Sequence, residues 1–208
     1  MKENLFSRSK SAHAGKDARA PGWKSRGYLP HFDGGEIPQM ITFRLADSLP
    51  QEVLANWKRQ LHGKGATRSA DTALRRRIET YLDMGYGYAY LKEHHMASLI
   101  QDSLLYLDGE RYRLLAWVIM PNHVHSLLTP FSGQPLSSIL HSLKSYTAQQ
   151  ANKYLRRRGR FWQEDYFDRF IRNDKHLAKA ITYIENNPVK AGLCRDARDW
   201  PFGSASFR

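Results

Sequence analysis

The strongest constraint on the fold is a pair of apolar runs joined by a two-residue turn. Residues 112–120 have the sequence YRLLAWVIM and residues 123–129 have the sequence HVHSLLT, with Pro121-Asn122 between them. Branched and aromatic side chains favour strands, and a Pro-Asn dipeptide favours a turn. The pattern predicts a β-hairpin whose second strand begins at His123.

The segments around this hairpin supply the other expected elements. Residues 39–46 (QMITFRLA) are rich in branched and aromatic side chains and stop at Asp-Ser-Leu-Pro, which predicts a strand followed by a helix start. Apolar residues three and four apart predict helices at 52–61, 70–82, 93–107 and 135–154. An aromatic-rich extended run at 160–171 and a last helix from 175 to about 187, which Pro188 should end, complete the chain. This order predicts an α+β fold, with a mainly antiparallel central sheet packed with helices.

Charge and cysteine content limit the class of protein. The 208 residues contain 32 Lys and Arg against 20 Asp and Glu, a net charge of +12 that favours a polyanionic partner, nucleic acid first. Residues 1–30 are rich in Lys and Arg and poor in apolar side chains, so we predict a basic N-terminal arm, DNA-contacting or merely solvated, before a domain at 31–208. The single cysteine, Cys194, excludes an intrachain disulfide and a multi-cysteine zinc site. No apolar run approaches the roughly 18 residues of a membrane span, so we expect a cytoplasmic protein without membrane contact.

The two histidines that open the second hairpin strand could share a metal ion. Side chains alternate between the faces of a strand, so His123 and His125 should project from one face with Cα atoms roughly 6.5 to 7 Å apart. Two imidazoles at that spacing can bind one divalent ion. An isolated His-x-His pair is a weak indication, because paired histidines also satisfy each other or the backbone inside a core.

A second group of polar residues follows about sixty positions later. Tyr183 and Asn187 are four residues apart, and residues at that spacing share a helix face. If this helix packs against the histidine strand, Asn187 supplies a third ligand and the Tyr183 phenol stands beside the ion. A phenol there predicts nucleophilic attack on a phosphodiester and a phosphotyrosine bond. The alternative is a core aromatic, because Ile181 and Ile184 flank Tyr183.

Together these segments resemble the HUH single-tyrosine transposases, specifically the REP-associated tyrosine transposases (RAYTs) related to bacterial insertion-sequence enzymes. The resemblance runs from about Tyr28 onwards and is carried by MITFRLADSLP, YRLLAWVIMPNHVHSLLTP, HSLKSYTAQQANK, GRFWQEDYFDRFIRN, YIENNPVKAGL and DWPFGSASF. It implies that His123 and His125 are the HUH histidines, that Tyr183 is the nucleophile and that Asn187 is the amide ligand. It also implies a ferredoxin-like sheet and activity on single-stranded DNA near short palindromic hairpins. Insertion-sequence relatives often carry glutamine where this chain has Asn187, whose shorter amide must approach the ion more closely.

Tyr146 is the competing nucleophile. It lies on the preceding predicted helix, where an apolar face accounts for it. In the family that the chain resembles, the catalytic tyrosine precedes the asparagine-proline text, as Tyr183 does. We therefore favour Tyr183.

Arginines and aromatic residues interleave between positions 156 and 172, the usual combination for binding single-stranded nucleic acid. Aromatic residues in a strand are often core residues instead, and a lysine is often simply solvated. With these alternatives open, the candidates for DNA contact are Lys144, Arg158, Arg160, Trp162, Arg169, Arg172 and Lys190.

The resulting expectation is a Mg²⁺- or Mn²⁺-dependent endonuclease and strand transferase for single-stranded DNA. It would act near REP-type palindromic hairpins through a 5′-phosphotyrosine intermediate, as a monomer rather than a dimer, in the bacterial cytoplasm near the nucleoid. Two alternatives stay open: a domesticated DNA-binding protein without catalysis, and a metal-dependent nuclease that forms no covalent intermediate.

Overall fold

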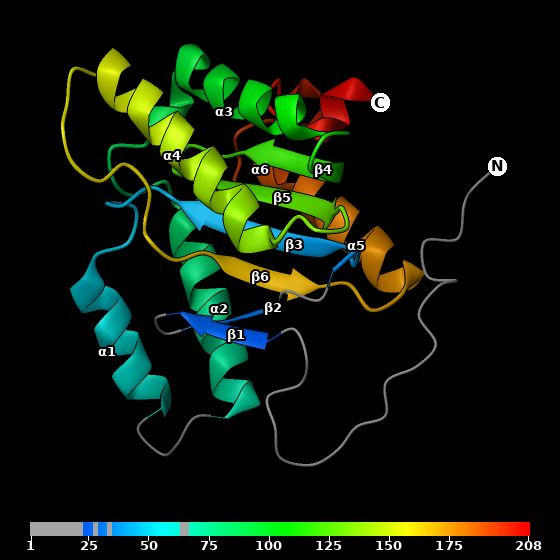
Figure 1. Ribbon diagram of the computed structural model, residues 1–208. Helices are drawn as coiled ribbons and strands as arrows, with labels where there is room; N and C mark the ends of the chain where they lie inside the picture. The colour runs from blue at the N-terminus through cyan, green and yellow to red at the C-terminus, as the bar shows by residue number, and fades with distance from the viewer. Residues whose placement is uncertain (1–22, 27–28, 33–34, 63–66) are drawn as a thin grey trace.

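A four-stranded antiparallel sheet forms the centre of the molecule (Figure 1). The computed structural model describes residues 23–26, 29–32, 35–62 and 67–208. The strand order is β4-β5-β3-β6, where β3 is Gln39–Arg44, β4 Tyr112–Ile119, β5 His123–Pro130 and β6 Phe167–Phe170. The predicted hairpin is confirmed as β4 and β5, and the predicted first strand is β3. The expected α+β class is also confirmed.

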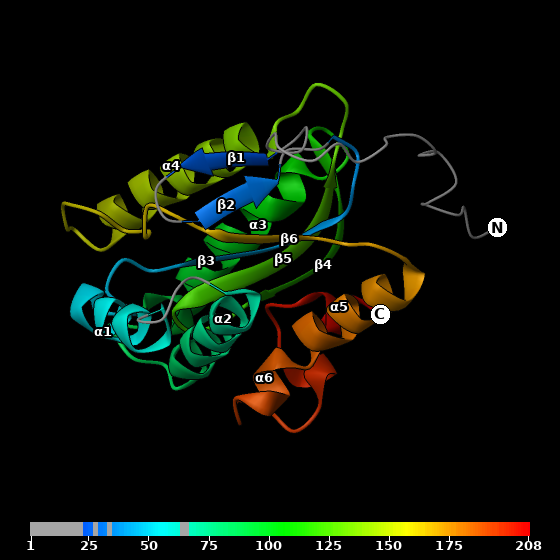
Figure 2. The same cartoon turned by 90° about the horizontal axis from the view of Figure 1, so that it is seen from below.

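Helices cover both faces of this sheet (Figure 2). Helices α3 (His94–Leu107) and α4 (Leu136–Tyr154) lie on one face, and α2 (Arg68–Asp83) and α5 (Asp174–Glu185) lie on the other. The remaining elements are β1 (Trp23–Arg26), β2 (Leu29–Phe32), α1 (Gln51–His62), α6 (Asn187–Lys190) and the short 3-10 turns η1 (Tyr90–Lys92), η2 (Ala197–Asp199) and η3 (Ser204–Phe207). Within the described residues, no helix combines the length and apolarity needed to cross a bilayer.

The alternation of β5 sends its side chains into two separate cores. Val124 and Leu128 pack with residues of α3 and α4 in the larger core. Leu127 belongs to the second core, where Ala180 and Ile184 of α5 pack on the sheet. Because His123 and His125 alternate with Val124, they share the α5 face with Leu127. A third apolar cluster joins α1 to α2 and includes Leu49, Leu54, Leu74, Ile78 and Leu82.

Segments outside the sheet cover both of its edges. Along β4, the Ile119 N–H donates to the Phe202 carbonyl at 2.8 Å, and Val118 bridges Gly203. At the opposite edge, the Phe32 N–H of β2 donates to Asp168 Oδ2 of β6 at 2.8 Å. Unpaired strand edges tend to pair with other chains, so the backbone pairing with Phe202 and Gly203 protects the β4 edge of the sheet.

Three sequence predictions need correction. The last long helix ends at Glu185, and a short new helix begins at Asn187. Pro188 can belong to this short helix because the N–H that proline lacks is not needed in a first helical turn. The extended run at 160–171 forms a strand only at β6. Part of the expected basic arm forms β1, and the boundary between positions 30 and 31 falls inside β2; residues 1–22 and 27–28 lie outside the described part of the chain.

Candidate active site

The two histidines of β5 face each other at hydrogen-bonding distance. His123 Nε2 lies 3.1 Å from His125 Nε2, and each residue is 1% exposed. Their strand neighbours on β3 are Arg44 and Thr42, respectively. The expected common face for the pair is therefore present in the structure.

Each imidazole is held through its other nitrogen. His123 Nδ1 donates to Asn122 Oδ1 at 2.7 Å, since the other end of that amide, Nδ2, donates to the Tyr86 carbonyl at 2.9 Å. His125 Nδ1 shares a 2.7 Å hydrogen bond with Thr42 Oγ1. Outer partners of this kind fix the ring orientation of metal-binding histidines and leave Nε2 free for the ion.

The spacing of the two Nε2 atoms matches two ligands of one ion. With metal–nitrogen bonds near 2.1 Å, two imidazole nitrogens on one ion lie about 3.0 Å apart when the angle at the metal is a right angle, and about 3.4 Å apart when it is tetrahedral. The observed 3.1 Å falls inside that interval. Without an ion, His125 Nε2 donates to His123 Nε2 across the same gap, because neutral His123 carries its proton on Nδ1, and His125 Nδ1 then accepts from the Thr42 hydroxyl.

Burial keeps both histidines uncharged. Desolvation lowers the pKa of His125 to about 3, with the Lys190 charge adding to the effect. It also lowers the pKa of His123 well below the usual range, assisted by His125, Lys190 and Arg44. Histidine binds a metal as neutral imidazole, so the pair does not need to lose protons near neutral pH before binding an ion.

Tyr183 of α5 packs directly against this pair. Its ring centroid lies 5.6 Å from that of His125 in an edge-to-face arrangement. Its hydroxyl is buried and makes no regular hydrogen bond with the described residues, although it lies beside Asn187 and Glu79. Burial, followed by the carboxylates of Glu79 and Asp83, raises the pKa of the Tyr183 phenol. The phenol is therefore neutral and needs assistance to become a nucleophile.

Asn187 stands next to Tyr183, at the start of α6. Its side chain is fully buried, and neither amide atom has a hydrogen-bond partner among the described residues. Buried polar groups are nearly always paired, and an unpaired one marks a functional site or an unfilled ligand position. The break between α5 and α6 thus leaves Tyr183 and Asn187 together, as their spacing predicted.

This donor set fits a divalent cation. No group of three or more His, Cys, Asp or Glu able to hold a metal occurs among the described residues, so a purely histidine, carboxylate or thiolate site is not present there. Two neutral imidazoles whose Nε2 atoms lie 3.1 Å apart and a buried, unpaired amide provide mixed nitrogen and oxygen ligands for a divalent cation. His123, His125 and Asn187 are the residues that would hold the ion.

Two charged residues lie beside Tyr183: Lys190, which the sequence analysis proposed as a DNA contact, and Glu79, which it did not predict. Glu79 of α2 is half-buried, and burial is the main cause of its raised pKa. Lys190 Nζ lies 5.8 Å from the centroid of the Tyr183 ring and 2.7 Å from Asp83 Oδ2. Only the packing of α2 against α5 brings Glu79 to this position, and periodicity does not predict that packing.

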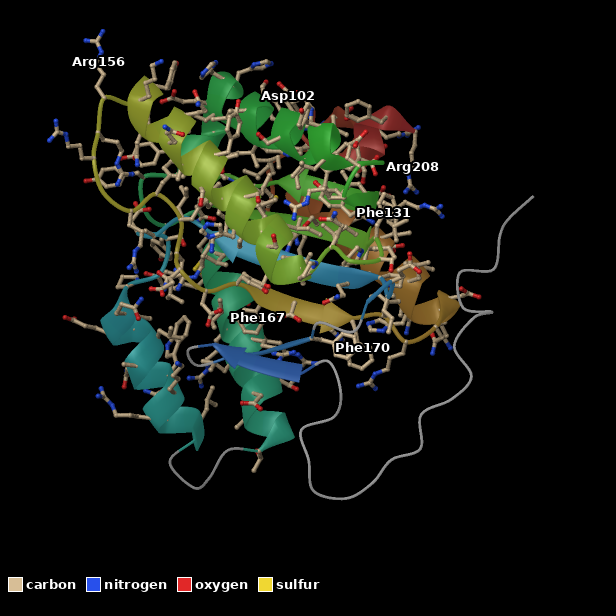
Figure 3. The ribbon with its side chains drawn as sticks, in the orientation of Figure 1. Asp102, Phe131, Arg156, Phe167, Phe170 and Arg208 are labelled. Atoms are coloured by element: carbon tan, nitrogen blue, oxygen red, sulfur yellow. The ribbon has the colours of Figure 1, made fainter. Side chains whose placement is uncertain are left out.

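A cavity of about 420 Å³ opens beside Tyr183, between the sheet, α2 and α5. Phe167 of β6 forms part of its wall and is labelled in Figure 3. The charged or polar residues that line the cavity include Thr42, Arg44, Arg75, Glu79, Arg169 and Lys179. The cavity gives a ligand access to the tyrosine from a side rich in cations.

The predicted DNA contacts differ in their surroundings. Arg158, Arg160, Arg169 and Arg172 are exposed. The Lys144 ammonium donates to the Gln163 and Glu164 carbonyls at 2.7 and 2.6 Å, so it already supports a loop. Lys190 is paired with Asp83.

Trp162 requires a correction. It is 4% exposed, packs in the larger core and donates its indole N–H to Thr147 Oγ1 at 2.9 Å. No ring face is open to a base in this conformation.

Tyr146 is half exposed on α4, which covers the sheet face opposite to the histidines. Tyr183 is therefore the tyrosine that contacts the histidine pair.

Comparisons with known proteins show which transposases the chain resembles. Residues 88–187, just under half of the chain, match the family model described as "Transposase IS200 like". This segment includes the histidine hairpin and α4 and ends at Asn187. This segment is similar to IS200-like transposases.

Individual relatives narrow this class. The chain is 28% identical over 109 residues to a REP-associated tyrosine transposase of Escherichia coli, and the aligned region covers 51% of this chain and 62% of that protein. It is 31% identical over 103 residues to a Haemophilus influenzae protein provisionally given the same name, covering 45% and 58%, respectively. The match thus spans about three fifths of the length of these relatives.

A solved structure carries the same fold. It is that of a REP-associated tyrosine transposase bound to a REP hairpin, with a TM-score of 0.56 and 17% identity, covering 88% of this chain and 84% of that one. The resemblance to REP-associated tyrosine transposases that the sequence predicts is confirmed.

Proposed function

We propose that this protein is a divalent-metal-dependent endonuclease and strand transferase for single-stranded DNA. The observation that carries the proposal is the contact of Tyr183 with a pair of neutral, buried histidines whose Nε2 atoms lie 3.1 Å apart. A hairpin-containing strand is the proposed substrate, supported by the REP hairpin bound in the solved relative. REP-type palindromes are the expected class of hairpin.

In the proposed reaction, Tyr183 Oη forms a bond to the scissile phosphorus and the bond from phosphorus to the 3′ oxygen breaks. The products are a 5′-phosphotyrosine and a free 3′-hydroxyl, and the energy of the phosphodiester is kept for rejoining a strand. Mg²⁺ or Mn²⁺ bound by His123, His125 and Asn187 would supply Lewis-acid polarisation of the phosphate. The phenol must lose its proton, and the adjacent Glu79 carboxylate, with a raised pKa, is the proposed acceptor. The departing 3′ oxygen takes up a proton from water to become the hydroxyl.

The surrounding charges support a polyanionic substrate. Exposed Arg158, Arg160, Arg169 and Arg172 are proposed phosphate contacts, and Lys144 and Lys190 remain candidates if they exchange their present partners for phosphate. We propose a monomer acting in the bacterial cytoplasm. The domain at 31–208, together with β1 and the start of β2, would be the catalytic unit, and the basic arm a further DNA contact.

The test is formation of a covalent adduct. Labelled single-stranded oligonucleotides carrying a REP-type palindromic hairpin with single-stranded flanks are incubated with the protein and Mn²⁺, then separated under denaturing conditions. We expect an adduct with the wild type and with Tyr146→Phe, and none with Tyr183→Phe. An adduct that persists in Tyr183→Phe would refute the nucleophile.

The same experiment separates the two other functions. Tight binding without cleavage under any divalent ion would identify a non-catalytic DNA-binding protein. Cleavage with release of both products and no adduct would identify a metal-dependent nuclease.

A further inference from the structure

An aromatic ladder rises from the core to solvent near the histidine strand. Phe161 is buried, and the Tyr90 ring lies against it with centroids 6.2 Å apart and planes 26° apart. Tyr88 stacks on Tyr90 at 5.2 Å and 16°. Tyr88 is 74% exposed, so the outer face of the ladder is open to solvent.

The backbone holds the outer ring in a defined position. The Tyr88 N–H donates to Asp47 Oδ2 at 2.7 Å. Gly87 has a φ of +90°, and a Cβ there would meet Asp47 at 3.0 Å. Ala89, between the two stacked tyrosines, has a φ of +50°, a left-handed conformation that destabilises a non-glycine residue. The loop therefore keeps a strained turn that orients a ring contributing little to core packing.

One arginine contacts this ladder, and two more are its neighbours in the sequence. The Arg157 guanidinium lies 5.4 Å from the Tyr90 ring centroid. Arg156 and Arg158 flank it after α4, and Figure 3 shows Arg156 pointing away from the body of the molecule. Exposed aromatic faces beside arginines are the usual means of binding unpaired bases, because any base can stack while the cations meet its phosphates.

The ladder is attached to the candidate active site. Asn122 donates through Nδ2 to the Tyr86 carbonyl and accepts through Oδ1 from His123. The Leu91 N–H donates to the Pro121 carbonyl at 3.1 Å. The loop that carries the tyrosines is thus bonded on both sides of the ladder to the turn that precedes the histidines.

We propose that Tyr88 is a stacking site for one unpaired base of the single-stranded DNA segment that adjoins the hairpin. The inference rests on the proposed function for its substrate class, and it assigns a binding residue outside the metal ligands and the nucleophile. Stacking on Tyr88 would hold the strand at a fixed distance from the histidine turn.

The experiment measures binding by fluorescence anisotropy. The probe is a labelled REP-type hairpin, with and without a single-stranded flank, and the variants are Tyr88→Ala, Tyr88→Phe and Tyr106→Ala. Tyr106 is a matched control because it is 81% exposed but lies on α3. For the flanked probe we expect about tenfold weaker binding with Tyr88→Ala, and binding within about twofold of wild type with the other two.

Abasic probes locate the stacked base. Bases are removed one at a time along the flank, and for the wild type one of these abasic positions should weaken binding. The same abasic probe should weaken binding by Tyr88→Ala very little, because that variant has already lost the stacking contact. Equal binding by Tyr88→Ala and wild type would overturn the proposal, as would an equal loss on the hairpin without a flank. Thermal melting of each variant checks that the loss is not unfolding.

The adduct assay separates this proposal from the catalytic one. If the wild type forms an adduct and Tyr88→Ala binds DNA as the wild type does, only the proposal of a stacking site is refuted. No adduct, with a flank-dependent effect of Tyr88→Ala, removes the catalytic proposal and leaves the stacking site standing.

Discussion

Replacing Asn187 by leucine should stabilise the protein in the absence of metal. The amide is fully buried, and both of its polar atoms lack partners among the described residues. Leucine has the same branching at Cγ, so it fills a similar space without polar atoms. An unpaired asparagine in such a position opposes stability, and the role that we propose for it is metal binding.

The size of the effect follows from the burial. An unpaired amide in an apolar setting costs about 1 to 3 kcal/mol in mutational data. Taking ~2 kcal/mol, the melting temperature should rise by about 4 to 8 °C, since 1 kcal/mol corresponds to about 2 to 4 °C in a chain of this length.

The assay is thermal unfolding in EDTA and again in excess Mn²⁺. In EDTA, Asn187→Leu should melt above the wild type. Mn²⁺ at a hundredfold excess over its dissociation constant should stabilise the wild type by about 2.7 kcal/mol, and the variant by much less. Asn173→Leu is the control, because the Asn173 side chain accepts from the His176 N–H and caps α5, so its loss should destabilise by about 1 kcal/mol. A leucine variant that is less stable than wild type in EDTA would refute the reasoning.

Three further substitutions test the surroundings of the site. Asn122→Ala leaves His123 Nδ1 and the Tyr86 carbonyl unpaired. We expect the free energy of unfolding, measured in urea, to fall by about 2 to 4 kcal/mol, and Mn²⁺ binding, measured by calorimetry, to weaken about 10- to 100-fold. An unchanged Mn²⁺ affinity would show that Asn122 does not support the metal-binding histidine. Glu79→Gln should slow single-turnover adduct formation about 100-fold or more with DNA affinity retained, and an unaltered rate would remove the proposed proton acceptor. Burial lowers the pKa of Lys144 to about 8 from an unfolded value of 10.5, so between these pH values the unfolded chain binds more protons and stability rises with pH. The free energy of unfolding of wild type minus that of Lys144→Gln should therefore increase by about 2 kcal/mol from pH 7 to pH 10, and a flat difference would contradict the burial of the ammonium.

The histidine hairpin and the Tyr183–Asn187 pair were predictable because each depends on local periodicity. Strand alternation places His123 and His125 on one face, and a spacing of four keeps Tyr183 with Asn187 even though the helix restarts between them. The three-dimensional neighbours of these residues depend instead on packing between distant segments.

The missed features share that dependence. Glu79 reaches Tyr183 only because α2 packs against the α5 side of the sheet, and Trp162 is buried because α4 crosses above it. Lys144 could not be distinguished from a solvated lysine, since the two carbonyls that bind it lie twenty residues away. The stacked pair of Tyr88 and Tyr90 depends on Asp47, which comes from another part of the chain.

The covering of the β4 edge has a consequence for synthesis. The backbone groups that occupy this edge belong to Phe202 and Gly203, which follow every strand of the sheet in the sequence. While the intervening residues are being made, the hairpin of β4 and β5 can exist with its outer edge open. A growing chain on a crowded polysome thus passes through an interval in which β4 can recruit a neighbouring nascent chain. The segment around Phe202 ends that interval and makes the sheet of each molecule self-contained.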